Sequence, residues 1–298
     1  MTVKFFLVSL LTVGSLCALE GVTDVNQTKP PAFNGETSKA LQKWRESHLG
    51  LKPYRPNYLL PFCVGDYDYK SYVPTDSYGR TEAEIQVSFK IDIARDLFDL
   101  DEIYFMSYSH KSQWQLYTES SPFRETNYNP EFFVKIPIYN DHSFFRIQSV
   151  TFGLAHLSNG QGSTEDIKDI EKYKDVENRS RSVNYVYGSL ALEHDSLMSE
   201  ITLWLPYRHN YDLEDNPDIM DYYGYWSAQL SYFYQKHLFT VKGRYNFETR
   251  FGAFETTYSH PLNDNVYLFA KYFSGYGDSL IDYNNNLSKF SIGFSFSR

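Results

Sequence analysis

The hexapeptide AHLSNG contains two side chains that could do chemistry together, His156 and Ser158. They lie two positions apart at the end of an apolar run, so in a β-strand both would emerge on the same face. A serine hydroxyl is a weak nucleophile alone, but an imidazole that is itself oriented by a third polar group can remove its proton. The candidates for that group in the next apolar segment are Ser180, Ser182 and Asn184. The spacing alone also fits two polar residues that close a strand.

Side-chain alternation indicates which face His156 and Ser158 would occupy. Both share the more apolar row of their strand, with Val150, Phe152 and Leu154. Asn184 also belongs to an apolar row, with Val186, Gly188, Leu190 and Leu192. In a membrane barrel such rows face lipid, where a polar side chain is costly unless it has a partner. We therefore expect His156, Ser158 and Asn184 to meet on the outer surface.

The elements that would position these residues alternate with period two. In EIQVSFKIDI, residues 84–93, apolar and polar side chains take turns, and the pattern returns in FSIGFS near the C-terminus. Candidate strands begin near residues 58, 84, 103, 131, 144, 182, 199, 222, 237, 251, 265 and 287. Many are about ten residues or longer, which is the length that a tilted strand needs to cross a bilayer.

Composition and the N-terminus agree with export to a membrane. The chain has 27 Tyr, 23 Phe and 4 Trp, and such rings suit the boundary between lipid and water. A net charge of −9 argues against a nucleic-acid partner. Residues 1–18 have the basic start, apolar core and small residues of a secretory signal peptide. Cleavage there would leave one cysteine, so we expect no internal disulfide and no thiolate metal site.

We therefore predict an all-β fold, a twelve-stranded antiparallel transmembrane β-barrel in a bacterial outer membrane. The domain organisation would be a signal peptide over 1–18, a polar N-terminal arm over 19–53 and the barrel over 54–298. A secreted β-sandwich or a soluble barrel is the alternative. One departure is the C-terminus FSFSR, because bacterial barrels commonly end on an aromatic residue.

Several long motifs in the same order resemble the outer-membrane phospholipase A family. They are YRPNYLLPF, HKSQWQLYTESSPFRETNYNPEFFV, AHLSNGQGS, SRSVN, EDNPDIMDYYGY and SGYGDSLIDYN, and the resemblance covers about residue 54 to the end. It implies a twelve-stranded barrel that is active as a homodimer in the outer membrane. It also implies calcium-dependent hydrolysis of acyl esters in glycerophospholipids, with A1, A2 and lysophospholipase activity.

The resemblance also implies roles for individual residues. Ser158 would be the nucleophile, His156 the general base and Asn184 the residue that orients the base. Calcium would be bound by the backbone carbonyl of Gln161, the hydroxyl of Ser180 and a serine from the other subunit, Ser120. Asp215 would belong to a further calcium position. Oxygen ligands of this kind suit calcium, which near the ester would stabilise the developing oxyanion.

Two features depart from the family pattern. The segment STEDIKDIEKYKDVENR, residues 163–179, is longer than in family members; we interpret it as a solvated charged loop, although Glu165 or Asp166 could add calcium ligands. His110 stands where the family has a glutamine that bonds across the dimer, so protonation could make dimer strength sensitive to pH. Two other functions remain open, a non-enzymatic porin-like barrel and a secreted soluble lipase.

Overall fold

The computed structural model describes residues 50–72, 77–138, 146–162, 178–207 and 215–297. The expected signal peptide and all of the expected arm before residue 50 lie outside these residues. So do Glu165 and Asp166, the two acidic candidates of the charged segment. Among the described residues, no helix is both long enough and apolar enough to cross a membrane.

The described chain forms thirteen strands and one short helix. The strands are β1 Lys52–Pro53, β2 Tyr58–Gly65, β3 Thr81–Arg95, β4 Ile103–Trp114, β5 Phe123–Pro137, β6 Arg146–Ser158, β7 Ser182–His194, β8 Leu197–Pro206, β9 Trp226–Tyr234, β10 His237–Tyr245, β11 Gly252–Pro261, β12 Tyr267–Tyr276 and β13 Asn286–Ser295. The helix is α3, Ile219–Tyr223. Strands β2 to β13 correspond to the twelve predicted segments, and β1 is a two-residue addition beside β3.

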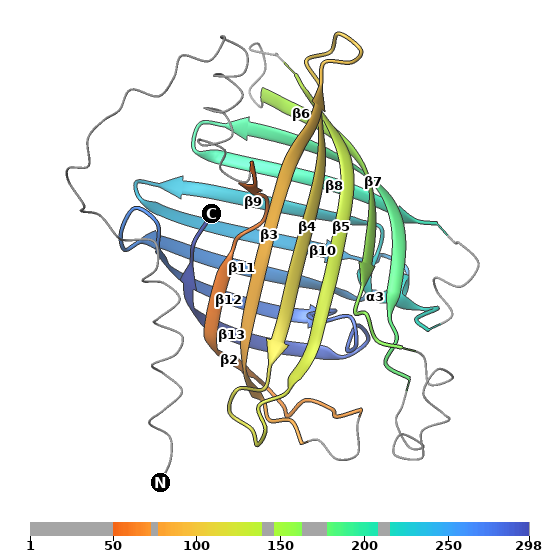
Figure 1. The fold of residues 1–298 in the computed structure, drawn as a ribbon, viewed down its shortest axis with the longest axis vertical. Coiled ribbons are helices and arrows are strands. Elements are labelled where there is room, and N and C mark those ends of the chain that lie inside the picture. The colour runs from red at the N-terminus through yellow and green to blue at the C-terminus, as the bar shows by residue number, and fades with distance from the viewer. Residues whose placement is uncertain (1–49, 73–76, 139–145, 163–177, 208–214, 298) are drawn as a thin grey trace, which may run out of the picture. The chain divides into compact units, whose positions relative to one another are not determined.

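Neighbouring strands pair antiparallel all the way around, so the sheet closes into a barrel (Figure 1). The N-terminal strand β2 pairs with the C-terminal strand β13 on one side and with β3 on the other. From β13 the pairing continues strand by strand down to β4, and the pairing of β4 with β3 closes the ring. Closure removes the exposed edges that a membrane could not satisfy. The prediction of a twelve-stranded barrel is confirmed.

Two predicted boundaries were wrong for identifiable reasons. Strand β5 begins at Phe123, not near residue 131, because its first half carries polar side chains on both faces and shows no apolar alternation. The segment that begins at Tyr222 was predicted as strand, but Tyr222 and Tyr223 end helix α3. Here Ile219 and Met220 are buried in a cluster with Leu280, which favours the helical turn over an extension of β9.

The two faces of the barrel wall differ in polarity. The outer face is apolar, with exposed side chains such as Phe152 and Leu154. Inside, charged groups pair in the buried interior: Lys271 and Lys289 both form ion pairs with Glu84. Such groups are stable there only because each finds an opposite charge and further hydrogen bonds.

Connections at the two ends of the barrel differ in length. At one end, β7 and β8 are joined by residues 195–196, and β9 and β10 by residues 235–236. At the other end, the connections 66–80 and 159–181 are much longer. Outer-membrane barrels have short turns on the periplasmic side and longer loops on the outside. The end that carries residues 159–181 is therefore the extracellular end.

Candidate active site

The structure places His156 and Ser158 on the outer face of the barrel at its extracellular end. They are the last outward positions of β6, and the two outward residues before them, Leu154 and Phe152, are 50% and 54% exposed. Asn184 occupies the corresponding row of β7, two positions before the outward Val186. The predicted parity of all three polar residues therefore holds.

His156 and Asn184 face each other directly across β6 and β7. The imidazole Nδ1 lies 2.6 Å from the side-chain oxygen Oδ1 of Asn184. An amide oxygen can only accept, so Nδ1 carries the proton and donates it. In the neutral form of the imidazole, Nε2 is then the nitrogen without a proton and can act as a base. Ser158 lies two residues along the same strand, next to Ser182 in the register.

The backbone beneath His156 is braced from inside the barrel. The side-chain nitrogen of Asn129 donates to the carbonyl of His156 at 3.0 Å. Asn129 in turn accepts from Arg55 at 2.9 Å, and Arg55 forms an ion pair with Glu131. This support could not be predicted from the sequence, because Asn129 lies on a different strand and contacts His156 only through the backbone.

Steric limits explain why a glycine, Gly160, stands in the sequence SNG at the end of the strand. Gly160 has a φ of 63°, a left-handed conformation that favours glycine over other residues. A Cβ at this position would also lie 3.0 Å from the ring of Tyr128. Tyr128 is the register neighbour of Ser158 on β5. Gly160 therefore lets the chain turn away from the strand immediately beside the serine.

Asn159 holds the two sides of the following loop together. It is 2% exposed, and its side-chain oxygen accepts the backbone N–H groups of Gln161 and Arg181 at 3.2 and 3.1 Å. Its side-chain nitrogen donates to the carbonyl of Arg179 at 2.7 Å. These bonds fix the start and the end of the 159–181 connection relative to each other. Asn159 was also absent from the sequence-based candidates.

A second asparagine connects two of the predicted calcium ligands. Asn178 donates to a carboxylate oxygen of Asp215 at 2.6 Å and accepts the backbone N–H of Ser180 at 3.0 Å. Asn216, next to Asp215, exchanges two hydrogen bonds with the backbone of Ser182. Ser180 and Asp215 are therefore brought to one place by neighbouring loops, although they are far apart in sequence.

The donor chemistry at this place fits a hard cation. A hydroxyl from Ser180 and a carboxylate from Asp215 are oxygen donors of the kind that calcium prefers. Asn159 ties the backbone of Gln161 to that of Arg181, the residue after Ser180. Among the described residues, no group of three or more His, Cys, Asp or Glu side chains could hold a metal ion. Any calcium here would thus depend on hydroxyl and carbonyl oxygens as well as on carboxylate.

Ser120 is the predicted ligand that this chain does not bring to the group. It lies in the turn between β4 and β5, with a φ of 60°. Within the described part of the chain, no hydrogen bond joins Ser120 to Gln161, Ser180 or Asp215. The expectation that this serine acts from another subunit stays a prediction.

His110 also faces outward, on β4. Its Nε2 lies 2.8 Å from the hydroxyl of Ser112, and that hydroxyl lies 3.0 Å from the hydroxyl of Thr126 on β5. The imidazole meets the ring of Tyr128 edge to face, with 5.2 Å between centroids. Since Tyr128 neighbours Ser158 in the register, a row of polar outward residues leads from His110 toward the serine.

Comparison with known proteins agrees with this fold and site. A family model described as Phospholipase A1 matches residues 36–296. Phospholipase A1 from Escherichia coli is 31% identical over 88% of this chain and 87% of its own length, and that from Klebsiella pneumoniae is 29% identical over 96% and 97%.

Two solved structures show the same barrel. Outer membrane phospholipase A from Escherichia coli, in an active-site mutant, has a TM-score of 0.75 at 29% identity and covers 85% of this chain and 93% of its own. The Salmonella typhi outer membrane phospholipase, a dimer with bound calcium, has a TM-score of 0.74 at 30% identity and covers 87% and 96%. The chain therefore belongs to the phospholipase A1 family of the outer membrane.

Proposed function

We propose that this outer-membrane phospholipase hydrolyses the acyl esters of glycerophospholipids with Ser158 as nucleophile, His156 as general base and Asn184 as the residue that orients the base. We further propose that it needs calcium and is active as a homodimer. The observation that carries the mechanism is the 2.6 Å contact between Nδ1 of His156 and Oδ1 of Asn184. It supports the proposal because a donating Nδ1 makes Nε2 of the neutral imidazole the nitrogen that would act on the serine.

In the first half of the reaction, Oγ of Ser158 attacks the ester carbonyl while Nε2 of His156 accepts its proton. The tetrahedral intermediate then collapses, and Nε2 returns the proton to the departing glycerol oxygen. This leaves the acyl group esterified to Ser158. In the second half, a water molecule loses its proton to Nε2 and attacks that ester. The second tetrahedral intermediate collapses, Nε2 returns the proton to the departing Oγ of Ser158, and the fatty acid is released.

Asn184 would orient the imidazole of His156 with a neutral amide and not with a charged carboxylate. Its amide oxygen holds the imidazole tautomer and orientation throughout both halves, because Nδ1–H remains bonded to it. A neutral amide stabilises the imidazolium less than a carboxylate would. It also avoids placing a bare carboxylate on the lipid-facing surface, where an isolated charge is costly.

Calcium would be held by the carbonyl of Gln161 and the hydroxyl of Ser180, with Ser120 from a second subunit, and Asp215 would serve a further position. When bound there, calcium would supply positive charge to the developing oxyanion. Backbone amides can add to this. The N–H of Asn159 donates to the carbonyl of Arg181 at 3.1 Å, so we propose the following N–H, that of Gly160, for this role.

The outward position of the site suits a substrate that diffuses in the bilayer. The ester of a phospholipid lies at the interface, and a serine at the extracellular rim can meet it without drawing the lipid into water. A requirement for two subunits and for calcium would keep such an enzyme silent in its own membrane. This account supports the enzyme over the porin-like alternative, as does the barrel interior, where Arg124 and Lys289 lie buried among carboxylates.

The test is calcium-dependent release of fatty acid from phosphatidylcholine in detergent micelles by the wild-type protein and by Ser158→Ala. We expect release by the wild type with calcium, little release with chelator, and none above background from Ser158→Ala. Full activity of the variant, or a wild type that releases nothing, would remove the proposal. Ion conductance by the reconstituted wild type without hydrolysis would instead favour the porin-like alternative.

A further inference from the structure

Pro130 leaves a gap in the hydrogen-bond ladder beside the proposed general base. The register of β5 with β6 pairs Tyr128 with Ser158. Two positions further along β5, Pro130 therefore stands opposite His156. The carbonyl of His156 points toward β5, because it accepts a hydrogen bond from Asn129 on that strand. A proline has no N–H to donate to a neighbouring strand, so the backbone of β5 cannot fix this carbonyl.

The side chain of Asn129 supplies the donor that Pro130 lacks. Asn129 is 5% exposed, and its Nδ2 donates to the carbonyl oxygen of His156 at 3.0 Å. An amide has a donating nitrogen and an accepting oxygen, so this bond forms in only one of the two orientations of the amide. In the flipped orientation the amide oxygen would face the carbonyl oxygen, and two acceptors repel each other. The backbone position of His156 thus depends on the orientation of this amide.

Arg55 selects the orientation of the amide that binds His156. Its guanidinium donates to Oδ1 of Asn129 at 2.9 Å. A guanidinium has donors only, so the amide must turn its oxygen toward Arg55 and its nitrogen toward His156. Arg55 is itself fixed by an ion pair with the buried carboxylate of Glu131. It lies between β1 and β2, so this control comes from the segment that precedes the first long strand of the barrel.

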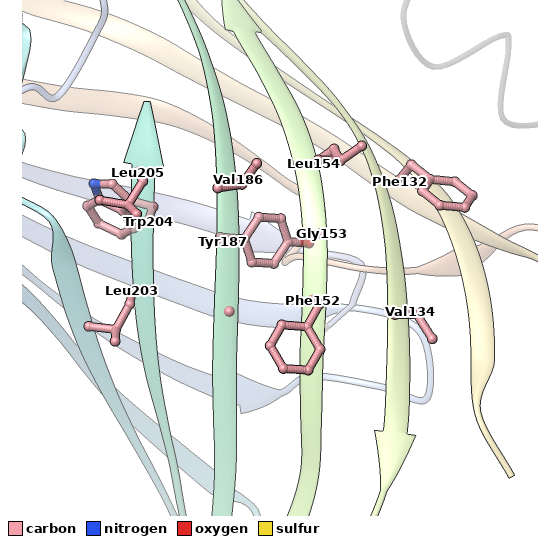
Figure 2. A pocket seen from close by; sticks show the side chains of 11 residues that line it. Phe132, Val134, Phe152, Gly153, Leu154, Val186, Tyr187, Leu203, Trp204 and Leu205 are labelled. Carbon is pink, nitrogen blue, oxygen red and sulfur yellow. The ribbon is translucent and has the colours of Figure 1, made fainter. Parts of the chain in front are cut away.

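Two tyrosines hold the carboxylate that anchors Arg55. Tyr187 donates to Glu131 at 2.9 Å, and Tyr54 donates to the same carboxylate oxygen at 3.2 Å. Figure 2 shows the ring of Tyr187 between β7 and Gly153 of β6. A Cβ at Gly153 would lie 2.5 Å from that ring, so this glycine lets the ring cross β6 toward Glu131. The anchor of Arg55 is therefore built from side chains of β5 and β7 and from the segment before β2.

We propose that Arg55 is a positioning residue for the general base, which acts through the side chain of Asn129 on the backbone of His156. The inference rests on the proposed function of His156. This residue is held at two points, its imidazole by Asn184 on the outer face and its carbonyl by Asn129 from the interior. Loss of the inner bond would let the backbone of His156 shift relative to Ser158. A displacement of about 1 Å at a catalytic group can cost about a hundredfold in rate.

The first test is the double variant Asn129→Asp with Glu131→Gln, which moves one carboxylate by two residues and keeps the total charge. Arg55 still finds an accepting oxygen and an opposite charge at position 129, but the donor to His156 is lost. In detergent micelles at saturating calcium, we expect kcat on phosphatidylcholine to fall about tenfold or more and KM to stay within about twofold of the wild type. Tm should stay close to that of the wild type, because Arg55 keeps a charged partner.

The second test changes Arg55 itself. Arg55→Met leaves Glu131 without its charged partner and can fail to fold, so Arg55→Met is also combined with Glu131→Gln, which removes both charges together. Both variants should lower kcat about tenfold and leave KM within about twofold of the wild type. Adding Asn129→Leu should lower kcat little further, because both changes act on one bond. Arg55→Lys can still donate to Asn129, so its kcat should stay within about threefold of the wild type.

Arg244→Met is the matched control. Arg244 also points into the barrel, but from β10, and it donates to the carbonyls of Tyr276 and Gly277. Its loss should lower Tm and leave kcat near the wild type. An unchanged kcat in the Arg55→Met or Asn129→Asp variants, or an equal fall in kcat in Arg244→Met, would overturn the positioning role while leaving the proposed function intact. A wild type that releases no fatty acid would remove both.

Discussion

His156 and Asn184 form a hydrogen bond of 2.6 Å between side chains that face each other across two antiparallel strands. Their geometry is set by the sheet, because the register fixes both Cα positions and the outward rows fix both side-chain directions. Nothing flexible lies between the two residues. The contact therefore orients the imidazole before any substrate arrives.

Replacing Asn184 by alanine should remove that orientation. We expect kcat to fall at least about a hundredfold, because the imidazole can then present the wrong tautomer or rotate away from Ser158. Asn184→Asp should retain more activity, since a carboxylate also accepts from Nδ1–H. Its negative charge favours the imidazolium, so the acid limb of the pH–rate profile should move to higher pH. An unchanged profile for Asn184→Asp would contradict the assigned contact.

Asn159 offers a test of the loop that would hold calcium. Asn159→Ala removes three side-chain hydrogen bonds that tie Gln161 to residues 179 and 181. Each such bond is worth about 1 kcal/mol, so we expect the calcium concentration for half-maximal activity to rise about tenfold or more. Activity at saturating calcium should recover toward the wild type.

A matched control for Asn159 is Asn246→Ala. Asn246 is also a buried asparagine that braces a loop, between β10 and β11, through bonds to Met220 and Glu248. It should change thermal stability without changing the calcium dependence. The same calcium shift in both variants would mean that the effect of Asn159→Ala is general loosening.

The sequence predicted those parts of the site that depend on strand parity and missed those that depend on contacts between distant loops. Alternation alone put His156, Ser158 and Asn184 on one surface, because the period of a strand is fixed. Asn159 and Asn178 could not be found this way, since their partners are backbone groups brought near only by folding.

Gly153 and Tyr187 provide a stability test inside the barrel wall. Gly153 faces inward, and a Cβ there would lie 2.5 Å from the ring of Tyr187. That ring is held by a 2.9 Å hydrogen bond from its hydroxyl to Glu131. Gly153→Ala must displace it, and overpacking of this kind costs about 1–3 kcal/mol. We expect a lower Tm in detergent. Gly243→Ala, on β10, is the control and should stay near the wild type, because a Cβ at that position would meet no atom closer than 4.0 Å.

A smaller side chain at position 187 should then relieve the strain. The double variant with Gly153→Ala and Tyr187→Leu should lose less stability than the sum of the two single variants, because the alanine methyl group would have room. Strict additivity of the two losses would show that Gly153 and Tyr187 do not compete for the same space.

Asp278 should make the barrel sensitive to acid. It lies in the connection between β12 and β13; burial raises the pKa of its carboxyl, but Lys111 and Lys289 outweigh burial and hold the pKa well below its usual range. Such a group stabilises the fold fully above its unfolded pKa of about 3.9 and loses this contribution as the pH falls toward its folded pKa. We expect Tm to drop in that acidic range.

Asp278→Asn tests this directly. Losing one member of a buried ion pair costs about 3–5 kcal/mol, so the variant should be less stable than the wild type at neutral pH. Its Tm should also change less with pH below about pH 4. Asp264→Asn, in the exposed connection between β11 and β12, removes the same charge. It should neither lower the stability at neutral pH nor change how Tm depends on pH. Parallel pH profiles for Asp278→Asn and the wild type would contradict this role.

His110 allows a test of the proposed dimer. Its imidazole faces outward on β4 beside Ser112 and Tyr128, so two copies brought together at this face would bury two imidazoles in an interface within the membrane. Protonation in mildly acidic solution would charge both, and a charge there is costly without an opposite partner. We therefore expect the proposed calcium-dependent dimer to dissociate more readily at mildly acidic than at neutral pH, as measured by sedimentation in detergent.

His110→Gln should keep a hydrogen-bonding side chain at this position and remove the titration. The variant should dimerise equally at both pH values, whereas His237→Gln, on β10, should keep the wild-type pH response. His237 also faces outward, and its imidazole forms a hydrogen bond with the hydroxyl of Tyr258. His237→Gln therefore tests whether the loss of any lipid-facing histidine would abolish the pH response of the dimer. A pH effect that persists in His110→Gln would place the responsible group elsewhere, and no pH effect in the wild type would remove the hypothesis.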